Sequence, residues 1–242
     1  MWGRFILALC GIAALACASA APSWAARTPS NDTSYGDNYS YAYHPALFGS
    51  REMYSSHTER FRAWNDMLSR TGSEFSGSQR ICATDRDTRC IPAEWQALIN
   101  ELRGQDIHTQ IERVNQAMNR HPYVTTVANW HQSMYWETPY EFLRYGGQCQ
   151  DYAIVKYYLL RAVGVPADQL RMVVLHHAAR AVDHAVLAVY IDHDIKILDN
   201  LRSDIVSADS ISYYRPYYSI NENGWWYHVG GQSMIRVAGG YR

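Results

Sequence analysis

Apolar residues recur every three or four positions in the first half of the chain, which is the spacing of one face of an α-helix. This spacing predicts helices around residues 61–68, 92–102 and 107–118. Their apolar positions are Phe61, Trp64 and Leu68, then Trp95, Leu98, Ile99 and Leu102, and then Ile107, Ile111, Val114 and Met118. Pro92 and Gly104 bound the middle helix, because proline suits the first turn and glycine the residue after the last turn.

Two signals follow in the middle of the chain. Residues 129–138 are rich in aromatic side chains and show no regular period. Thr138, Pro139 and Glu141 then form the pattern of a capping box with proline at the first helical position. A short helix is therefore expected from this point to the glycine pair at 146–147.

The next apolar run, residues 149–161, has apolar side chains almost all round its helical projection, and Gly164 and Pro166 end it. We expect this helix to lie at the centre of the fold. Beyond it come short β-branched segments separated by polar turns, a pattern typical of strands. The expected strands are 170–175, 184–191 and 195–198, with weaker ones at 225–228 and 234–237. Helices followed by strands predict an α+β fold, with N-terminal helices packed on an antiparallel sheet.

The composition is that of a globular protein. Of 242 residues, 48% are hydrophobic and 19% are charged, and the net charge is −1. This balance gives no electrostatic footprint for nucleic acid or for an anionic membrane, so neither is expected as a partner. No internal repeat or second domain boundary is visible. We expect one domain over residues 51–242, preceded at 27–50 by a flexible or loosely docked lead-in without apolar period.

Residues 1–26 have the pattern of a secretory signal peptide. Arg4 precedes an apolar run from Phe5 to about Ala18, and small residues suited to cleavage follow. The run is short for a membrane span, although a transmembrane anchor and a lipid-modified Cys17 are competing interpretations. Export to the periplasm or to the medium is therefore expected.

Export changes how the cysteines are interpreted. Cleavage of the signal peptide removes Cys10 and Cys17 with it. Cys82 and Cys90 bracket a short polar loop, and in an oxidising compartment we expect them to form a local disulfide. Cys149 is then left unpaired, and its surroundings decide whether it is buried and inert or reactive.

Cys149 stands where a nucleophile is expected. It follows the glycine pair 146–147 and begins the central helix, where unpaired backbone N–H groups and the helix dipole favour a thiolate. His184 opens one expected strand and Asp199 closes the next. If these strands pair through the turn at 192–194, the two side chains come near each other. Nucleophile, base and base-orienting acid are then all present.

Each of the three residues also has a structural interpretation. A helical cysteine is most often a small buried hydrophobe, His184 has rivals in His176 and His177, and Asp199 with Asn200 could form a turn. Taken together, however, the ordered set favours catalysis. Other chemistries lack their motifs, because the chain contains no CxxC or HExxH, no GxGxxG or P-loop, and no GxSxG.

A longer stretch around the cysteine carries a family resemblance. Residues 138–165, TPYEFLRYGGQCQDYAIVKYYLLRAVGV, are followed by HAVLAVY and ILDN, preceded by YWETP, and joined near the end by SINENGWW. In this order the chain resembles the bacterial transglutaminase-like cysteine proteinases, the LapG type of periplasmic protease. The resemblance covers most of residues 55–230.

The resemblance implies a papain-like core of the transglutaminase type. In it, Cys149 matches the nucleophile, His184 the base and Asp199 the orienting acid. The backbone N–H of Cys149 and a second donor would hold the oxyanion, and Trp136 and Gln132 are candidates for that donor.

The resemblance also implies partners. The best-known members cut a large surface adhesin, are controlled by an inner-membrane receptor that senses cyclic di-GMP, and bind calcium. Their nucleophile lies in an acidic GDCED run, whereas here Gln148 and Gln150 flank Cys149 and only Asp151 keeps its charge. Calcium prefers carboxylate oxygens, so we expect calcium binding to be weak or absent. A substrate other than an adhesin is equally compatible with this departure.

We therefore predict an exported cysteine endopeptidase. Transfer of the acyl group to an amine instead of water would make the chain a transglutaminase or amidase. From a different class, a non-catalytic binding module would use an aromatic-rich surface. That surface would comprise Tyr213, Tyr214, Tyr217, Tyr218, Trp225 and Trp226.

Overall fold

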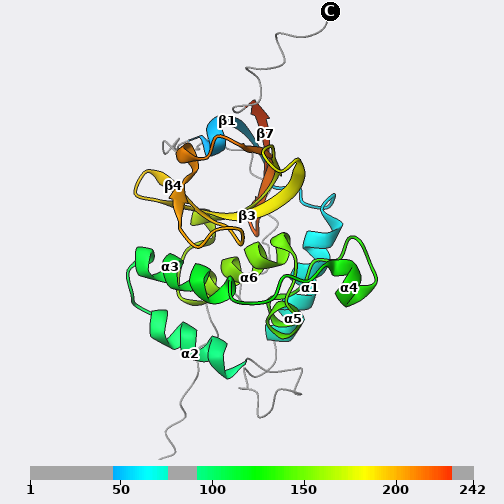
Figure 1. Cartoon of the computed structure of the whole chain (residues 1–242), viewed down its shortest axis with the longest axis vertical. Coiled ribbons are helices and arrows are strands. Elements are labelled where there is room, and N and C mark those ends of the chain that lie inside the picture. Colours follow the sequence, from blue (N-terminus) through cyan, green and yellow to red (C-terminus); the bar gives the residue numbers. More distant parts are fainter. Residues whose placement is uncertain (1–45, 76–91, 231–242) are drawn as a thin grey trace, which may run out of the picture. The chain divides into compact units, whose positions relative to one another are not determined.

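The computed structural model describes residues 46–75 and 92–230, in which helices lie on one side of a curved sheet (Figure 1). Within these residues, no helix combines the length and the apolar character needed to cross a membrane. The expected signal peptide, the Cys82–Cys90 disulfide and the strand at 234–237 lie outside the described residues.

The helices predicted from apolar spacing and from the capping box are confirmed. The α-helices are α1 (Arg62–Phe75), α2 (Ala93–Leu102), α3 (Ile107–Met118), α4 (Thr126–Trp130), α5 (Pro139–Tyr145) and α6 (Cys149–Ala162), and the 3-10 helices are η1 (Leu47–Gly49), η2 (Ala167–Gln169) and η3 (Ala208–Ser210). At α5, the Thr138 hydroxyl accepts from Glu141 N at 3.2 Å and the Glu141 carboxylate from Thr138 N at 2.8 Å. Helix α4 was not predicted, because five residues are too few to show a period.

The strands form one antiparallel sheet. They are β1 (Ser50–Ser55), β2 (Leu170–His177), β3 (Val182–Ile191), β4 (Asp194–Leu198), β5 (Val206–Ser207), β6 (Tyr214–Asn221) and β7 (Gly224–Gly230). Their order across the seven-stranded sheet is β1-β7-β6-β2-β3-β4-β5. The predicted α+β fold is therefore confirmed.

The sheet is buried on both faces in its centre. Helix α6 packs against β2 and β3, and its residues 151–160 are all buried. On β2 and β3, alternate side chains belong to a hydrophobic cluster, which we call the second cluster to distinguish it from the packing around α6. Its members include Val173 of β2, Val186 of β3, Ile195 and Ile197 of β4, and Tyr214 of β6. A helix with apolar side chains all round its surface is what this central place requires, so its predicted position is confirmed.

The prediction of a flexible or loosely docked lead-in at 27–50 is wrong for the last residues of that range. Leu47 and Phe48 are buried in the second cluster, and the Phe48 ring stands edge-on to Tyr214 at 5.5 Å between ring centres. Ser50 already belongs to β1. Two consecutive large apolar side chains have more to gain from burial than from exposure, which anchors this segment to the sheet.

Strand β6 was not predicted either, and Pro216 explains why. Proline cannot donate to a strand ladder, so it normally argues against a central strand. Here the pairing with β2 shifts at this point, from Val174 opposite Tyr218 to Leu175 opposite Pro216. The resulting bulge leaves Tyr217 outside the ladder and gives Pro216 a place in the middle of the sheet.

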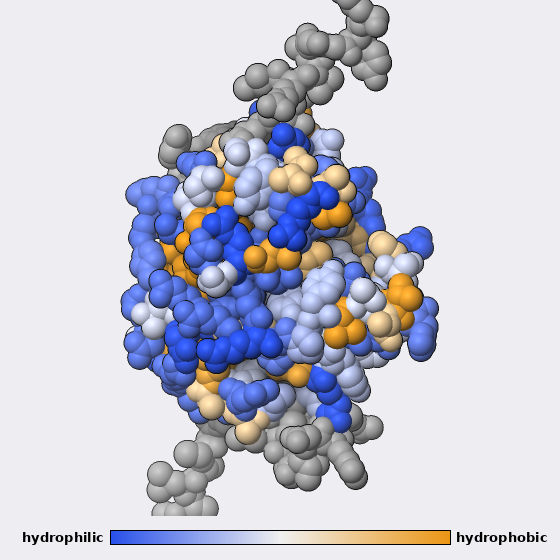
Figure 2. All heavy atoms as spheres, viewed as in Figure 1, coloured by the Kyte–Doolittle hydropathy of each residue, from blue (hydrophilic) through white to orange (hydrophobic). Residues whose placement is uncertain are grey.

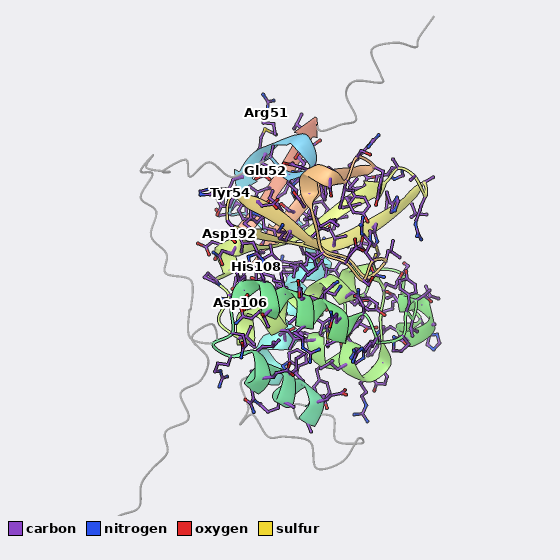
Figure 3. The ribbon with its side chains drawn as sticks, turned by 60° about the vertical axis from the view of Figure 1, so that its left-hand side comes forward. Arg51, Glu52, Tyr54, Asp106, His108 and Asp192 are labelled. Carbon is purple, nitrogen blue, oxygen red and sulfur yellow. The ribbon has the colours of Figure 1, made fainter. Side chains whose placement is uncertain are left out.

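A tight hairpin joins β3 to β4. Asp192 and His193 form its loop, and both have positive φ, at 51° and 62°, as a two-residue hairpin turn of type I′ requires. Asp192 also lies 3.0 Å from His108 of α3, so the tip of the hairpin touches the helical layer (Figure 3). This turn sets the register that brings His184 and Asp199 together.

A fully buried lysine lies between the helices and the end of β4. Lys156 of α6 donates to Asn115 of α3 at 2.8 Å, and the Asn115 amide donates to the backbone oxygens of Arg202 and Ser203. Burial lowers the pKa of Lys156 to about 7, against an opposing effect of the Asp199 charge. The side chain therefore connects the central helix to the loop that follows Asp199.

This burial predicts a pH-dependent stability. The unfolded chain keeps the Lys156 proton up to the ordinary pKa of 10.5, while the folded chain releases it near 7. Between these values the unfolded state binds more protons, so the free energy of unfolding rises with pH by about 1.4 kcal/mol per unit from this group. Urea unfolding from pH 7 to 9 should show this rise in the wild type relative to Lys156→Met.

The second lysine of the chain supplies the control. Lys196 pairs with Asp194 at the surface, at 2.8 Å. The Lys196→Met variant should follow the pH dependence of the wild type. Identical pH dependence in Lys156→Met and the wild type would show that Lys156 does not titrate in this window.

Candidate active site

The turn before Cys149 needs both of its glycines. Gly146 has φ of 69°, and a Cβ on it would lie 2.3 Å from the carbonyl oxygen of Pro122. A Cβ on Gly147 would lie 2.9 Å from carboxylate oxygens of both Asp151 and Glu137. Neither position therefore has room for a side chain, and the backbone can turn tightly before the helix. Cys149 follows as the first residue of α6, partly exposed and with a free thiol.

The Asp151 carboxyl group holds this turn in place. Its Oδ1 accepts from the backbone N–H of Glu137 at 2.9 Å, and its Oδ2 accepts from that of Gln148 at 2.8 Å. The side-chain amide of Gln150 also donates to Oδ2, at 3.1 Å. Burial, reinforced by the nearby Glu137 charge, raises the pKa of Asp151 to about 8. Asp151 therefore keeps its proton at neutral pH.

Glu137 connects helix α4 to the turn before Cys149. Its Oε1 accepts from Asn129 at 2.9 Å and from the Trp130 indole at 2.7 Å. Its Oε2 is buried without a hydrogen-bond partner, and burial raises the pKa of Glu137. The carboxyl groups of Asp151 and Glu137 thus join helix α4, the start of α5 and the start of α6.

His184 and Asp199 form a buried pair on the sheet side. His184 Nε2 lies 2.8 Å from Asp199 Oδ1, and only 5% of His184 and none of Asp199 is exposed. Burial opposes ionisation of Asp199, yet hydrogen bonds from His184, Tyr214 and the backbone N–H of Leu201 lower its pKa below the usual value. Asp199 is therefore a carboxylate at neutral pH.

The register of the hairpin explains this contact. Leu187 pairs with Leu198, so Asp199 comes directly after the last ladder pair and His184 lies three residues before it on β3. The two residues are diagonal neighbours on one face of the sheet. Their predicted proximity across the hairpin is confirmed, although they are not directly opposite each other.

Cys149 reaches His184 from the helix side. Burial lowers the pKa of His184, but hydrogen bonds and charge from Asp199 and Cys149 outweigh it and raise that pKa to about 9. Because His184 Nε2 already forms a hydrogen bond with Asp199, Nδ1 is the nitrogen of His184 that can interact with the sulfur of Cys149. The structure thus brings the three predicted residues together, while their catalytic roles stay a prediction.

The rival histidines have other surroundings. His176 lies 3.3 Å from Asp183 near the surface. His177 stacks on Tyr213 with ring centres 4.9 Å apart and lies 6.2 Å from the His184 ring. Burial and the His184 charge lower the pKa of His177, so it stays neutral beside a charged His184.

Two supporting residues were not foreseen from the sequence. Tyr214, interpreted as part of an aromatic surface, is buried and donates its hydroxyl to Asp199 Oδ2. Asn119 of α3 donates to the backbone oxygens of Asp199 and Arg202, at 2.9 and 2.8 Å. Neither has a sequence signal, because Pro216 hides the period of β6 and the Asn119 contact spans distant segments. Of the six aromatic residues assigned to that surface, Tyr217 alone is exposed.

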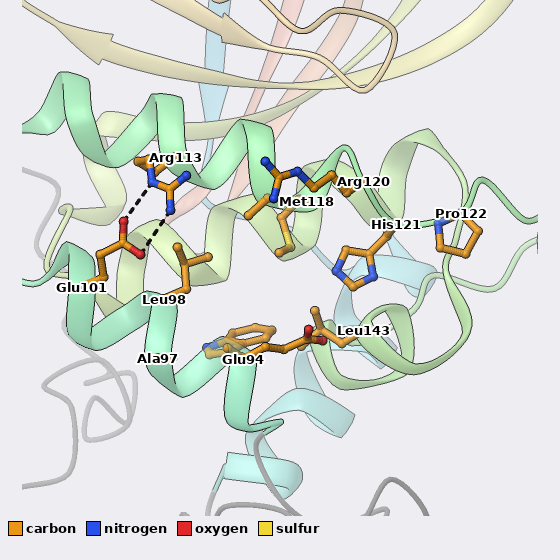
Figure 4. Close-up of a pocket in the computed structure, with 12 residues that line it drawn as sticks. Glu94, Ala97, Leu98, Glu101, Arg113, Met118, Arg120, His121, Pro122 and Leu143 are labelled. Atoms are coloured by element: carbon orange, nitrogen blue, oxygen red, sulfur yellow. Dashed lines mark hydrogen bonds and ion pairs between the residues drawn. The ribbon is translucent and has the colours of Figure 1, made fainter.

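A separate cavity of about 510 Å³ lies among α2, α3 and α5 (Figure 4). An ion pair between Arg113 and Glu101, with N–O distances of 2.9 and 3.2 Å, closes one side. His121 and Pro122 form another part of its wall. The three predicted catalytic residues do not line it, so this cavity is not the place of the predicted chemistry.

Comparison with known proteins points to the same chemistry. Residues 71–234 match the family model of the bacterial transglutaminase-like cysteine proteinases. The chain belongs to this family. Legionella pneumophila LapG is 31% identical over 69% of this chain and 84% of that one, with a TM-score of 0.51. Its calcium-bound form is 31% identical over 69% and 86%, with a TM-score of 0.52. Its EGTA-treated form is 31% identical over 70% and 86%, also with 0.52.

This bacterial transglutaminase-like cysteine proteinase is therefore a cysteine protease with a protein substrate, and the resemblance noted in the sequence is confirmed. Among curated proteins, no significant match to the chain was found.

The charge on His184 predicts how the thiol of this proteinase reacts. A protonated His184 stabilises a thiolate at Cys149, so iodoacetamide should label Cys149 at about pH 6, where ordinary thiols with a pKa of about 8.5 are almost wholly protonated. His184→Ala should slow this labelling by on the order of 100-fold, since the thiolate loses its counter-charge. Mass spectrometry of the Cys149 peptide over time measures the rate.

His176→Ala is the matched control, because His176 is the nearby histidine that pairs with Asp183 instead. It should label at the wild-type rate. Equal rates in His184→Ala and the wild type would remove His184 from the role of base.

Proposed function

We propose that this protease is an exported endopeptidase, periplasmic or secreted, in which Cys149 is the nucleophile, His184 the base and Asp199 the acid that orients His184. The observation that supports it best is the buried His184–Asp199 contact of 2.8 Å beside a partly exposed cysteine at a helix start. Nucleophile, base and orienting group in this order are what thiol catalysis requires.

In the first step, Cys149 Sγ attacks the carbonyl carbon of the scissile peptide bond. The C–N bond breaks, His184 gives its proton to the leaving amine, and a thioester remains on the sulfur. In the second step, water gives a proton to His184 and adds to the thioester. The C–S bond breaks, releasing a carboxylic acid and restoring the thiolate and imidazolium pair.

Helix α6 supplies part of the oxyanion hole. The backbone N–H of Cys149 is a first-turn donor that lacks a carbonyl partner within its own helix, so it can donate to the oxyanion. Trp136 and Gln132 remain the candidates for the second donor. Gln132 is exposed in the loop after α4, whereas Trp136 packs edge-on to Trp64 with ring centres 6.4 Å apart.

The substrate that the resemblance suggests is a cell-surface protein such as a large adhesin, with an inner-membrane receptor as regulator. The signal-peptide pattern of residues 1–26 supports export, and the Cys82–Cys90 disulfide is part of the same proposal.

The proposed role of Cys149 as the nucleophile predicts that its substitution abolishes cleavage. In a comparison of newly formed N-termini on cell-surface proteins, cleavage products seen with the wild type should be absent with Cys149→Ser, since a hydroxyl paired with His184 is a far weaker nucleophile than a thiolate. The Tm should stay within a few degrees, because the side chains differ by one atom.

The same samples distinguish hydrolysis from acyl transfer. With a fluorescent primary amine present, hydrolysis predicts cleavage without labelled protein. Amine incorporation that depends on Cys149 would instead identify a transglutaminase. Full cleavage by Cys149→Ser would show that another residue is the nucleophile.

Calcium is the remaining question, because one structure of the Legionella relative is calcium-bound. In this chain both Asp151 oxygens already accept N–H donors, and so does Glu137 Oε1. The Gln148 amide donates to Thr126 Oγ1, and the Gln150 amide lies 3.5 Å from the same oxygen. N–H groups turn their positive ends to these oxygens, and Glu137 Oε2 is the one oxygen of these two carboxyl groups without a hydrogen bond. A single oxygen is too few for a hard cation that takes about six to eight oxygen ligands. We propose that the two glutamine amides connect α4 to α6 without a metal.

Calorimetry should therefore find no tight calcium binding to the wild type, and EGTA should leave the labelling rate of Cys149 unchanged. The Gln148→Asp, Gln150→Glu double variant restores two carboxylates and should gain calcium binding. Tight binding to the wild type that is lost in Gln148→Ala and Gln150→Ala would overturn this proposal.

A further inference from the structure

The segment before the nucleophile turn carries an unusual composition. From residue 121 to residue 136 the chain has no Asp, Glu, Lys or Arg, although 19% of all its residues are charged. At that average, sixteen residues would contain about three charges. The segment instead alternates aromatic, aliphatic and small polar side chains, and it is bounded by Arg120 and Glu137.

Three large apolar side chains of this segment lie in the open. Tyr123 is 56% exposed, Val127 57% and Met134 76%. They stand before, within and after helix α4, and Figure 2 shows hydrophobic surface gathered over this helix. We call these three residues the neutral wall.

Several contacts place the neutral wall beside Cys149. Tyr123 forms a parallel bridge with Gly147, and Val124 N donates to Gly147 O at 3.0 Å. Thr126, next to Val127, accepts from the side-chain amide of Gln148. Each of these partners lies within two residues of the nucleophile, so the backbone that carries Tyr123 and Val127 lies beside the turn that leads to Cys149.

The same surface is electrostatically coupled to the thiol. Burial raises the pKa of Tyr123, and the negative charge of Cys149 adds to this effect. The carboxyl group of Asp151 of α6 is the other titratable group that acts on Tyr123, and Tyr152 of α6 stacks on the Tyr123 ring with ring centres 6.5 Å apart.

Helix α4, which carries Val127, is firmly anchored to the rest of the fold. The Trp130 ring packs against Tyr135 and Tyr145, with ring centres 4.7 and 5.7 Å away. Its indole N–H is held by the buried Glu137. A surface that stays apolar and exposed while its supporting rings are packed and hydrogen-bonded is organised for a partner rather than left over from the core.

We propose that the neutral wall of Tyr123, Val127 and Met134 binds the substrate polypeptide next to the scissile bond and selects an extended segment of uncharged, apolar side chains. This inference rests on the proposed function, because a substrate that reaches Cys149 must pass this surface. Covering the wall with apolar side chains removes apolar surface from water. A charged side chain would lose water there without meeting an opposite charge.

The test uses a peptide library derived from a whole proteome, with cleavage sites located by mass spectrometry. The wild type should prefer neutral, apolar residues on one side of the cleaved bond over Asp, Glu, Lys and Arg. Val127→Ser with Met134→Ser should lower kcat/KM on a preferred peptide at least tenfold, chiefly through KM, since the wall binds without touching reacting atoms. Labelling of Cys149 by iodoacetamide should stay at the wild-type rate.

Two further variants make the test independent of folding. Met53→Ser with Tyr227→Ser removes an apolar pair on the β1–β7 ladder that is about half exposed and should change nothing. Val127→Lys adds a positive charge to the wall and should shift the preference toward acidic residues, a gain that misfolding cannot produce.

The possible outcomes distinguish failure of the neutral wall from failure of the proposed endopeptidase function. Cleavage without a neutral preference, or a preference that Val127→Lys leaves unchanged, would overturn the neutral wall alone. Peptide cleavage that is as absent in the wild type as in Cys149→Ser would overturn the endopeptidase proposal and the wall together.

Discussion

The buried carboxyl group of Asp151 is the interaction on which the site depends. One side chain at the third position of α6 accepts from the backbone of Gln148, which precedes the nucleophile, and from the backbone of Glu137, which precedes α5. It fits only because Gly147 has no side chain. Burying such a group is costly unless it is fully hydrogen-bonded. Its bonds therefore fix where Cys149 sits relative to the helices around it.

A second buried carboxyl group, Asp199, does the same for the sheet. Its oxygens hold His184 from β3, Tyr214 from β6 and the backbone that follows β4. Asn119 and Lys156 hold its loop from the helical layer, one directly and one through Asn115. Cys149 and His184 thus belong to different layers, each organised by one carboxyl group, and packing of α6 on the sheet aligns them. Asp151 keeps its proton whereas Asp199 stays ionised, because only Asp199 faces a positive partner.

The fold and the proximity of His184 to Asp199 were predictable where local chemistry leaves a periodic trace. Helices with apolar faces, the capping box at Thr138 and the hairpin between His184 and Asp199 all follow from spacing and turn residues. The bulge at Pro216, the burial of Leu47 and the support that Tyr214 gives Asp199 leave no such trace. Each depends on contacts between segments far apart in the chain, so tertiary packing outweighs local preference there.

The two neutral features of the site support each other. Gln148 and Gln150 are uncharged residues beside the sulfur, and the segment 121–136 contains no Asp, Glu, Lys or Arg. Without anions close to the thiolate, the field at Cys149 is set mainly by the α6 dipole and by the His184–Asp199 pair. A wall without charge then leaves that field undisturbed when substrate arrives. The amide contacts of Gln148 and Gln150 with Thr126 connect α4 to α6 without adding charge. The neutral residues on both sides of the sulfur therefore support two proposals, an apolar substrate surface and a site that does not bind calcium.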